Sequence, residues 1–428
     1  MISNPQPSKP LKVLFLTAYY PPEVGAAQTR THEMALRLSN TGYDVSVLTT
    51  FPSYPSGIVP KEWKGKFFWK GSEEGIRICR VWSYTAPGGK FLIRLLNNLT
   101  FAVFATLIGL WLSRPDVIVV ESHPLFNGVA AIFLSALKRV PFVLNVSDLW
   151  PESAVQIGAL KNPLLIWLGE KLEHLLYQRA ATILAMTGGI WNKIRRDGVD
   201  ASKVLLFRNA VDCDFFRPGV DGMGMRAKLG VAPDAFMVLY AGTFGMFNDT
   251  QSILETAARF QQENDSRVQF VFAGDGNERR RLQDFATENG LANVRFVGSF
   301  PKAAVPALLS ASNCVVIALK SLEFLQGTLP RKMFEAMACA KPVVLAAAGE
   351  AEEVVRMAEG GICVPPENCA LIHDAVLQLV TNPEQASVMG QSGRRYVQEH
   401  FSQDKRANEL SGQLQLLFCS PNGDAKPR

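Results

Sequence analysis

The chain has 428 residues, of which 48% are hydrophobic and 19% charged, so it is a folded protein too long for one ordinary hydrophobic core. Its formal charge of +5 suits a phosphate-bearing ligand or an anionic surface and argues against a dedicated nucleic-acid binder. The seven cysteines form no CxxC pair, as expected for a reduced cytoplasmic protein without a zinc site. The polar first residues do not resemble a signal peptide.

Strand and helix patterns alternate along the chain, which predicts an α/β fold with two doubly wound, Rossmann-like domains facing a cleft. The first series of strands is expected at 12–18, 44–50, 117–121, 142–146, 182–186 and 204–207, with a helix at 28–40. A second series is expected at 237–242, 268–273, 294–297, 314–318 and 343–345, with a helix at 252–263. Two sheets imply two lobes.

These elements divide the chain into four parts. We expect an N-terminal Rossmann-like domain at 1–208, a glycine- and proline-rich linker at 209–233, and a C-terminal Rossmann-like domain at 234–395. The last part, 396–428, should contain a helix that returns to the first lobe, followed by a disordered tail.

Two segments of the first half raise the question of membrane contact. Residues 95–113 carry no charge over nearly the length that spans a bilayer. Because a strand of the same domain follows, we expect a buried or interface-lying helix instead of a span. Upstream, residues 61–71 alternate lysine with tryptophan and phenylalanine, a mixture that suits a lipid headgroup region. A solvated loop whose aromatic rings pack locally is the alternative.

A second-half segment, 327–344, places two cations where a helix disfavours them. Pro330 suits the first helical position, with Thr328 or Leu329 as cap, so Arg331 and Lys332 fall in the first turn. Their charges oppose the helix dipole unless an anion lies beside the free backbone N–H groups. Glu335 lies on the same helical face. Phosphate plus hydroxyl groups indicates a nucleotide sugar, and a surface helix with an i,i+4 salt bridge is an equal alternative.

In open α/β sheets the ligand lies beyond the carboxyl ends of the strands. After the first strand, Gly25 and Ala26 precede a helix, and small residues there let backbone amides approach a phosphate. This loop is not GxGxxG, so a nicotinamide cofactor is poorly supported. A tight turn without any ligand is at least as good an interpretation.

Two further loops of the first half should meet at the cleft. His123 follows the strand at 117–121, and Ser147 follows the strand at 142–146. Asp148 and Glu152 could accept sugar hydroxyls or orient an acceptor, while Trp150 offers a flat surface for a sugar ring. A backbone-bonded loop histidine and a helix-capping aspartate are the structural alternatives.

Loops of the second half bring glycine to one cleft edge. Gly242, Thr243 and Gly245 follow one strand, and Gly274 and Gly276 follow the next. We expect the three arginines at 279–281 to form a solvated helix face in preference to a phosphate-binding site. The DxD pattern at 212–214 follows a strand at a domain linker, so we expect turn residues and no metal.

Together these motifs resemble retaining glycosyltransferases of family 4, which have the two-lobed GT-B fold, over nearly the whole chain. The sequence stretches that carry the resemblance are YYPPEVGAAQTR, SDLWPESAV, RNAVDCDFF, YAGTFG, FAGDGNERRRL, FVGSFP, LPRKMFEAMACAKPVV and AAGEAEEVV. DLWPE together with LPRKMFEAM is the most specific part. It is similar to the subgroup of bacterial surface-polysaccharide transferases that includes N-acetylfucosamine and N-acetylglucosamine transferases.

The resemblance implies a hexosyltransferase without metal or cofactor, acting on a nucleotide diphosphate sugar and a lipid-linked or saccharide acceptor. The second lobe would hold the donor and the first the acceptor. Glu335 matches the family glutamate that binds the ribose hydroxyls, Lys332 a subgroup lysine near the phosphates, and Gly25 the glycine that faces the diphosphate. We expect Lys332, His123 and Asp148 to be catalytic. The enzyme would lie in the cytoplasm, peripheral at the inner face of the cytoplasmic membrane, with no nucleic-acid partner.

Several positions depart from the family pattern. Gly327 stands where a first glutamate is usual, Thr243 and Phe247 where an arginine and a lysine are common, and Ser147 where a histidine is common. Fewer cations are therefore available to neutralise the diphosphate, and Arg331 and Lys332 would supply a larger share of the positive charge. Two alternatives stay open: a GT-B nucleotide-sugar epimerase, and an inactive scaffold of a membrane assembly.

Overall fold

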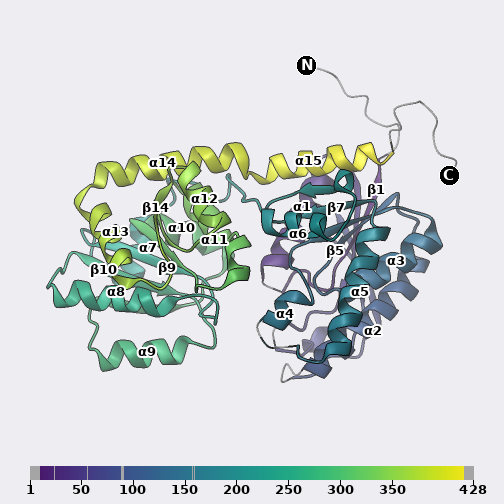
Figure 1. Cartoon of the computed structure of the whole chain (residues 1–428), viewed down its shortest axis with the longest axis horizontal. Coiled ribbons are helices and arrows are strands. Elements are labelled where there is room, and N and C mark those ends of the chain that lie inside the picture. Colours follow the sequence, from purple (N-terminus) through teal and green to yellow (C-terminus); the bar gives the residue numbers. More distant parts are fainter. Residues whose placement is uncertain are drawn as a thin grey trace, which may run out of the picture. The chain divides into compact units, whose positions relative to one another are not determined.

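The computed structural model describes residues 10–23, 25–54, 56–87, 91–156, 158 and 160–418. The chain forms two compact units (Figure 1). The first unit contains the residues up to Arg208 together with those from Arg406 onward, and the second contains Asn209–Lys405.

The first unit is built on one eight-stranded sheet with the order β3-β4-β2-β1-β5-β6-β7-β8. All neighbouring strands are parallel except β3 and β4, which form an antiparallel hairpin at one edge. The strands are β1 (Lys12–Leu16), β2 (Asp44–Thr50), β3 (Phe68–Glu73), β4 (Ile76–Val81), β5 (Val117–Glu121), β6 (Phe142–Val146), β7 (Thr182–Ala185) and β8 (Val204–Leu206).

Helices cover both faces of this sheet because alternate residues of its strands point to opposite sides. Leu14 and Leu16 pack toward one face, which bears α2 (Phe91–Trp111), α3 (Phe126–Lys138), α5 (Pro163–Arg179) and α6 (Gly188–Arg196). Val13 and Phe15 pack toward the other, which bears α1 (Ala26–Asn40) and the later part of α15 (Gln403–Leu416). The remaining helical pieces are α4 (Glu152–Gln156), η1 (Lys61–Trp63) and η2 (Ala201–Lys203).

The second unit has a six-stranded parallel sheet with the order β11-β10-β9-β12-β13-β14. Numbered within the unit, this is 3-2-1-4-5-6, the order of a dinucleotide-binding doubly wound sheet. The strands are β9 (Phe236–Ala241), β10 (Val268–Ala273), β11 (Val294–Gly298), β12 (Cys314–Ala318), β13 (Val343–Ala346) and β14 (Gly361–Val364). The order reverses between β9 and β12.

The helices of the second unit again lie on both faces of its sheet. One face packs against α8 (Thr250–Gln262), α9 (Arg279–Glu288) and α13 (Cys369–Thr381). The other packs against α7 (Gly222–Leu229), α10 (Val305–Ala311), α11 (Arg331–Ala338), α12 (Glu350–Met357) and α14 (Pro383–His400). Two short 3-10 helices, η3 (Lys302–Ala304) and η4 (Glu323–Gly327), complete the unit.

The predicted α/β class and the two doubly wound units are confirmed, and the strands at 44–50, 117–121, 142–146, 268–273 and 314–318 match to the residue. The hairpin of β3 and β4 and the last strand, β14, were missed. β3 was hidden because its sequence, FWKGSE, is exposed on most of its length and lacks an apolar run. The helix expected at 95–113 begins earlier, at Phe91, and ends at Trp111.

The segment 209–233, predicted as a linker, lies inside the second unit and contains α7. Asp221 caps this helix by accepting a hydrogen bond from the Gly224 N–H, and Gly230 ends it in the left-handed conformation. Met225 and Leu229 are buried in the core of the unit. Glycine and proline here therefore mark helix ends and turns, and apolar burial fixes the segment.

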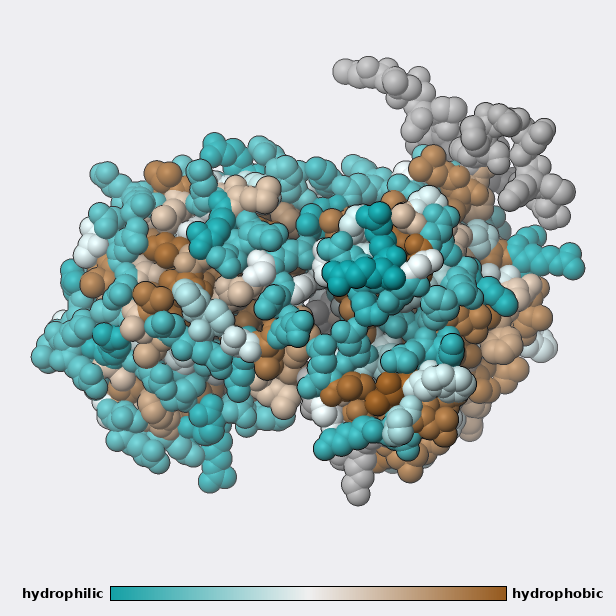
Figure 2. All heavy atoms as spheres, viewed as in Figure 1, coloured by the Kyte–Doolittle hydropathy of each residue, from teal (hydrophilic) through white to brown (hydrophobic). Residues whose placement is uncertain are grey.

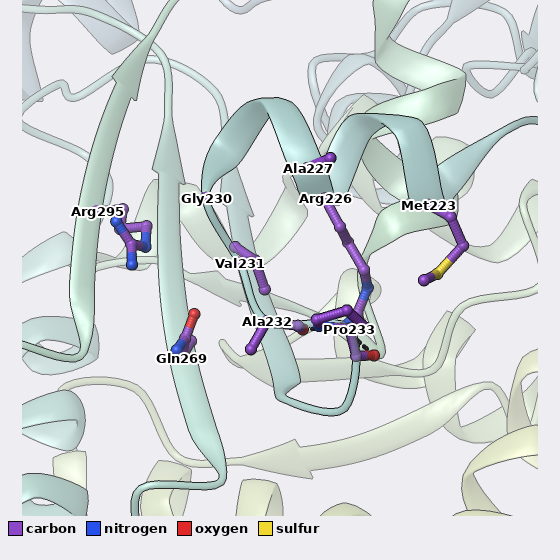
Figure 3. Close-up of a pocket in the computed structure, with 9 residues that line it drawn as sticks. All are labelled: Met223, Arg226, Ala227, Gly230, Val231, Ala232, Pro233, Gln269 and Arg295. Atoms are coloured by element: carbon purple, nitrogen blue, oxygen red, sulfur yellow. Dashed lines mark hydrogen bonds between the residues drawn. The ribbon is translucent and has the colours of Figure 1, made fainter.

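A cavity of about 550 Å³ lies beside α7, at the end of the sheet where β10 and β11 begin (Figure 3). Arg226 is its buried cation. The guanidinium donates to the carbonyls of Ala232, Ala235 and Ala311 and to the side chain of Asn313. Burial lowers its pKa. Because these acceptors surround it, Arg226 serves to tie α7 and its loop to the sheet.

We expect Arg226→Met to destabilise the second unit by about 3 kcal/mol, since it leaves several buried carbonyls without a donor. Urea unfolding followed by circular dichroism measures the change. Arg295→Met is the matched control, because Arg295 lines the same cavity but is exposed. Equal stability of the two variants would contradict the structural role of Arg226.

Candidate functional site

The second unit gathers polar groups at the point where its strand order reverses. The loop after β9 and the loop after β12 meet there, because Asn248 and Leu319 form an isolated antiparallel bridge. The amino end of α11 contributes Lys332 to the same place. In doubly wound sheets this crevice beyond the carboxyl ends of the strands is where ligands bind.

Lys332 is held by strand β9 and the loop that follows it. Its Nζ lies 3.0 Å from Oδ1 of Asn248, 3.4 Å from the hydroxyl of Tyr240 and 4.4 Å from the centre of the Tyr240 ring. The Tyr240 hydroxyl and Nδ2 of Asn248 both donate to the carbonyl of Thr243. The ammonium is thus positioned by neutral acceptors and an aromatic face, and Asn248 is a member of the site that the sequence analysis missed.

The charge of Lys332 is disfavoured in two ways. Burial lowers its pKa to about 8, against a smaller opposing effect of Glu335. In addition, Lys332 is the second residue of α11, where the helix dipole opposes a cation. An anion bound at this helix end would relieve both costs.

The first turn of α11 has the predicted charges but a different cap. Pro330 is the N-cap, with φ −63° and ψ 124°, so its predicted place as the first helical residue is wrong, as is the cap at Thr328 or Leu329. Arg331 does open the helix, and its Nε lies 3.7 Å from Oε1 of Glu335, the expected i,i+4 pair. Both side chains are largely buried, so only a small part of each charged group is exposed.

Glycine is required where the loops after β9 and β10 touch. A Cβ on Gly274 would lie 1.8 Å from the carbonyl oxygen of Gly242, and one on Gly276 would lie 2.4 Å from that of Phe244. Both glycines have φ near 150°, which other residues rarely adopt. A Cβ on Gly242 would meet Nζ of Lys332 at 3.2 Å, whereas Gly245 has only an ordinary contact at 3.6 Å. The loop contact therefore explains Gly274 and Gly276 without a ligand, and the close approach of Lys332 explains Gly242.

The depressed pKa of Lys332 predicts a pH-dependent cost to folding. Its folded-state pKa of about 8 lies below the ordinary 10.5, so burying the charged form costs stability below pH 8, and the cost fades as the pH rises toward 10.5. Lys332→Met should therefore raise the free energy of unfolding by roughly 2 kcal/mol at pH 7 and by much less near pH 10.5.

Urea unfolding at both pH values measures this difference, with the exposed Lys320, replaced by Met, as the control. A destabilised Lys332→Met variant at pH 7 would show that its ammonium is a favourable structural contact.

In the first unit, the loops after β5 and β6 meet as predicted. His123 Nδ1 lies 4.0 Å from Oδ2 of Asp148, and both side chains are more than 40% exposed. The Ser153 hydroxyl donates to the same Asp148 oxygen at 2.9 Å. The Tyr19 ring, from the loop after β1, lies 6.4 Å from His123, and burial raises the pKa of Tyr19 to about 12. These groups form an open, polar cluster at the carboxyl ends of three strands.

Below this cluster lies Glu121, a buried acid at the end of β5 that the sequence analysis missed. Its carboxylate accepts hydrogen bonds from Asn145 at 2.7 Å and from the Ser147 hydroxyl at 2.5 Å, and pairs with Arg30 at 3.0 Å. The available signal was an acid ending an otherwise apolar strand, VIVVE. The Ser147 hydroxyl hydrogen is thus donated inward to Glu121. The lone pairs of the Ser147 oxygen are left to accept a hydrogen bond from a bound hydroxyl group.

The other predicted positions of the first unit are less exposed or less central. Trp150 packs partly against the core, with its ring over Gly169 of α5. Glu152 is exposed at the start of α4, where its carboxylate accepts from Gln156. Gly25 precedes α1 with an extended backbone, φ 171°, and Ala26 begins that helix, while the side-chain surroundings of Ala26 lie outside the described part of the structure.

The arginine run and the DxD pattern have the local roles expected of them. Arg279 lies 3.7 Å from Asp275, and Arg281 pairs with Glu278 on the exposed face of α9. Asp212 accepts hydrogen bonds from the N–H groups of the two residues that follow Cys213, as a turn residue does. Among the described residues, no group of three or more His, Cys, Asp or Glu side chains is placed to hold a metal.

Comparisons with known families match both units. The family described as glycosyl transferase 4-like domain matches residues 25–210, and the family described as glycosyl transferases group 1 matches residues 224–396. The chain is therefore a glycosyltransferase, with the two Rossmann-like domains of the GT-B fold.

Similar proteins extend over nearly the full length. A chain named putative colanic acid biosynthesis glycosyl transferase WcaI, from Escherichia coli, is 24% identical over 94% of this chain and 100% of its own length. The structure of sucrose-phosphate synthase from Thermosynechococcus elongatus has a TM-score of 0.75 at 19% identity and covers 96% and 99% of the two chains. Anabaena HepE, solved with UDP and glucose, has a TM-score of 0.72 at 18% identity and covers 95% and 100%.

Proposed function

We propose that this glycosyltransferase moves a sugar of the N-acetylhexosamine type, with retention of anomeric configuration, from a nucleotide diphosphate sugar to a lipid-linked or oligosaccharide acceptor in surface polysaccharide synthesis. Similarity to the chain named for colanic acid biosynthesis supports the pathway class. The structure of HepE with UDP and glucose supports the donor class. The sequence resemblance to surface-polysaccharide transferases supports the sugar type.

The observation that carries the proposal is the ammonium of Lys332. It stands at the amino end of α11, at the reversal point of the sheet, where burial lowers its pKa. A diphosphate there would receive hydrogen bonds from Lys332 and from the free backbone N–H groups of the helix. Glu335, one turn further along the same face, would accept hydrogen bonds from the ribose hydroxyls.

The chemistry we propose is electrostatic. As the bond between the anomeric carbon and the diphosphate oxygen breaks, negative charge grows on that oxygen, and Lys332 and Arg331 stabilise it. The acceptor hydroxyl oxygen forms the new bond on the same face of the sugar, and its proton passes to the departing phosphate oxygen. The resembled family needs no metal for this step, and we propose the same here.

On the acceptor side, we propose that His123 and Asp148 orient the attacking hydroxyl. Both are exposed and within 4.0 Å of each other, so one hydroxyl group can contact both. Ser147 would add a hydrogen-bond acceptor, since Glu121 fixes the direction of its own hydroxyl hydrogen. We place the enzyme in the cytoplasm, peripheral at the inner face of the cytoplasmic membrane.

Donor binding tests the central group. In calorimetric titrations with UDP-, GDP- and dTDP-hexoses, one donor should bind, and Lys332→Met should weaken it at least about tenfold, as expected for loss of a charge-assisted hydrogen bond. Because a group with a pKa of about 8 loses most of its charge by pH 8.5, wild-type affinity should fall about fourfold between pH 7 and 8.5. The Lys320→Met control should keep the wild-type values. Absence of heat with every donor would overturn the proposal.

Turnover tests the reaction type. With the donor that binds and a membrane lipid extract, Lys332→Ala should slow transfer about a hundredfold, the size typical of a lost electrostatic donor. The product linkage, determined by NMR, should keep the anomeric configuration of the donor. Isomerisation of the donor alone would indicate the epimerase, and binding without consumption would indicate an inactive scaffold.

A further inference from the structure

Helix α2 presents a continuous apolar stripe to the outside of the first unit. The outward residues recur at intervals of three or four, so they share one face of the helix. Their exposed fractions run from 39% to 87%, and they are Leu92, Leu96, Leu99, Val103, Leu107 and Trp111. An apolar stripe of this length on a folded domain marks an interaction surface.

Three polar residues of α2 are bonded within the unit and do not interrupt this stripe. Asn97 donates to the carbonyl of Tyr84 and to the Ser83 hydroxyl, in the loop after β4. Thr100 and Thr106 donate to helix carbonyls one turn back, at distances of 2.7 Å each. The side-chain donors of these three residues are therefore satisfied within the unit, and none of the three adds a polar group to the stripe.

The apolar surface continues onto neighbouring elements. Phe133 and Leu137 of α3, which packs beside α2, are 53% and 61% exposed. Before β3, Phe67 is 64% exposed and joins α2 through Trp82, whose ring contacts Phe104. Hydrophobic residues gather at the right-hand edge of the molecule in Figure 2, where Figure 1 places α2 and α3.

The two helices that build most of this surface, α2 and α3, carry no acids. Residues 91–115 contain two arginines and no aspartate or glutamate, and residues 122–147 contain one lysine, one arginine and likewise no acid. Arg114 and Arg139, which follow the carboxyl ends of α2 and α3, are both exposed. Lys66 and Lys70, on the adjoining hairpin, lie over the rings of Trp63 and Phe68. Apolar side chains edged by cations complement the hydrocarbon and headgroups of an anionic bilayer.

The contacts of the inner face of α2 determine whether the helix can span a membrane or can only lie on its surface. The helix is long and apolar enough to cross a bilayer. However, Phe101 and Ala105 are fully buried in the core of the sheet, and a Cβ on Gly109 would lie 2.8 Å from the Leu134 side chain. Crossing the bilayer would remove these residues from the core, so the helix must stay on the domain.

We infer that the outer face of α2, together with Phe133 and Leu137 of α3, docks on a bilayer of anionic phospholipid, with the helix lying along the surface. This deepens the membrane location proposed above but does not depend on the sugar transfer. It specifies which face of the first unit contacts lipid and that the contact is interfacial.

The test is flotation of the full-length protein with vesicles. Wild type should float with vesicles of phosphatidylethanolamine, phosphatidylglycerol and cardiolipin, and more weakly with phosphatidylcholine alone. The double variant Val103→Glu, Leu107→Glu should lower the partition coefficient at least tenfold. Its matched control is Met357→Glu, Val388→Glu, two exposed apolar residues of the second unit, which should float like wild type. Circular dichroism melting of each variant verifies that it is folded.

Two further measurements separate the outcomes. Brominated lipids should quench Trp111 fluorescence, and the quenching should be lost in Trp111→Phe. Alkaline carbonate should release the bound protein, whereas retention would indicate a span and overturn the interfacial geometry. Failure of the folded wild type to float would overturn the inference, as would concentration-dependent dimers that the α2 double variant alone abolishes. None of these results depends on whether a sugar donor binds.

Discussion

The arrangement of the second unit depends on one costly group, the ammonium of Lys332. Burial and the dipole of α11 both disfavour its charge, and in the described structure its hydrogen-bond partners are an amide oxygen and a phenol. A protein selected for stability alone would replace it with an apolar side chain of similar size. A buried cation that costs stability, located where a doubly wound sheet reverses its strand order, is typical of a site that binds an anion.

The loops around Lys332 are organised to hold it at that place. Gly274 and Gly276 allow the loop after β10 to contact the loop after β9 backbone to backbone, so the β9 loop has little freedom to move. That loop in turn supplies Asn248, and β9 supplies Tyr240. The glycine contacts therefore restrict the movement of the residues that hold the Lys332 ammonium. The glycines can have this role even if no phosphate binds directly to their backbone.

Periodicity and spacing predicted the sheets and the charged helix end, because these are local properties of the chain. Parallel strands buried on both faces appear as apolar runs, and Arg331, Lys332 and Glu335 share a face by helical geometry alone. Asn248, Tyr240 and Glu121 were missed because their importance comes from tertiary contacts: a bridge to Leu319, a ring beneath an ammonium, and a buried carboxylate with three partners. The exposed hairpin strand β3 was missed because its pairing with β4, and not its own pattern, makes it a strand.

The same distinction resolves the apolar helix of the first unit. From composition, α2 is indistinguishable from a membrane span, because both of its faces are apolar. The structure assigns the faces different partners: Phe101 and Ala105 belong to the core, while Val103 and Leu107 face outward. A helix whose inner face is needed for folding can offer only its outer face to another phase. An acceptor that carries a lipid would be most concentrated in that phase, so an interfacial helix on the domain expected to bind it would bring enzyme and acceptor together.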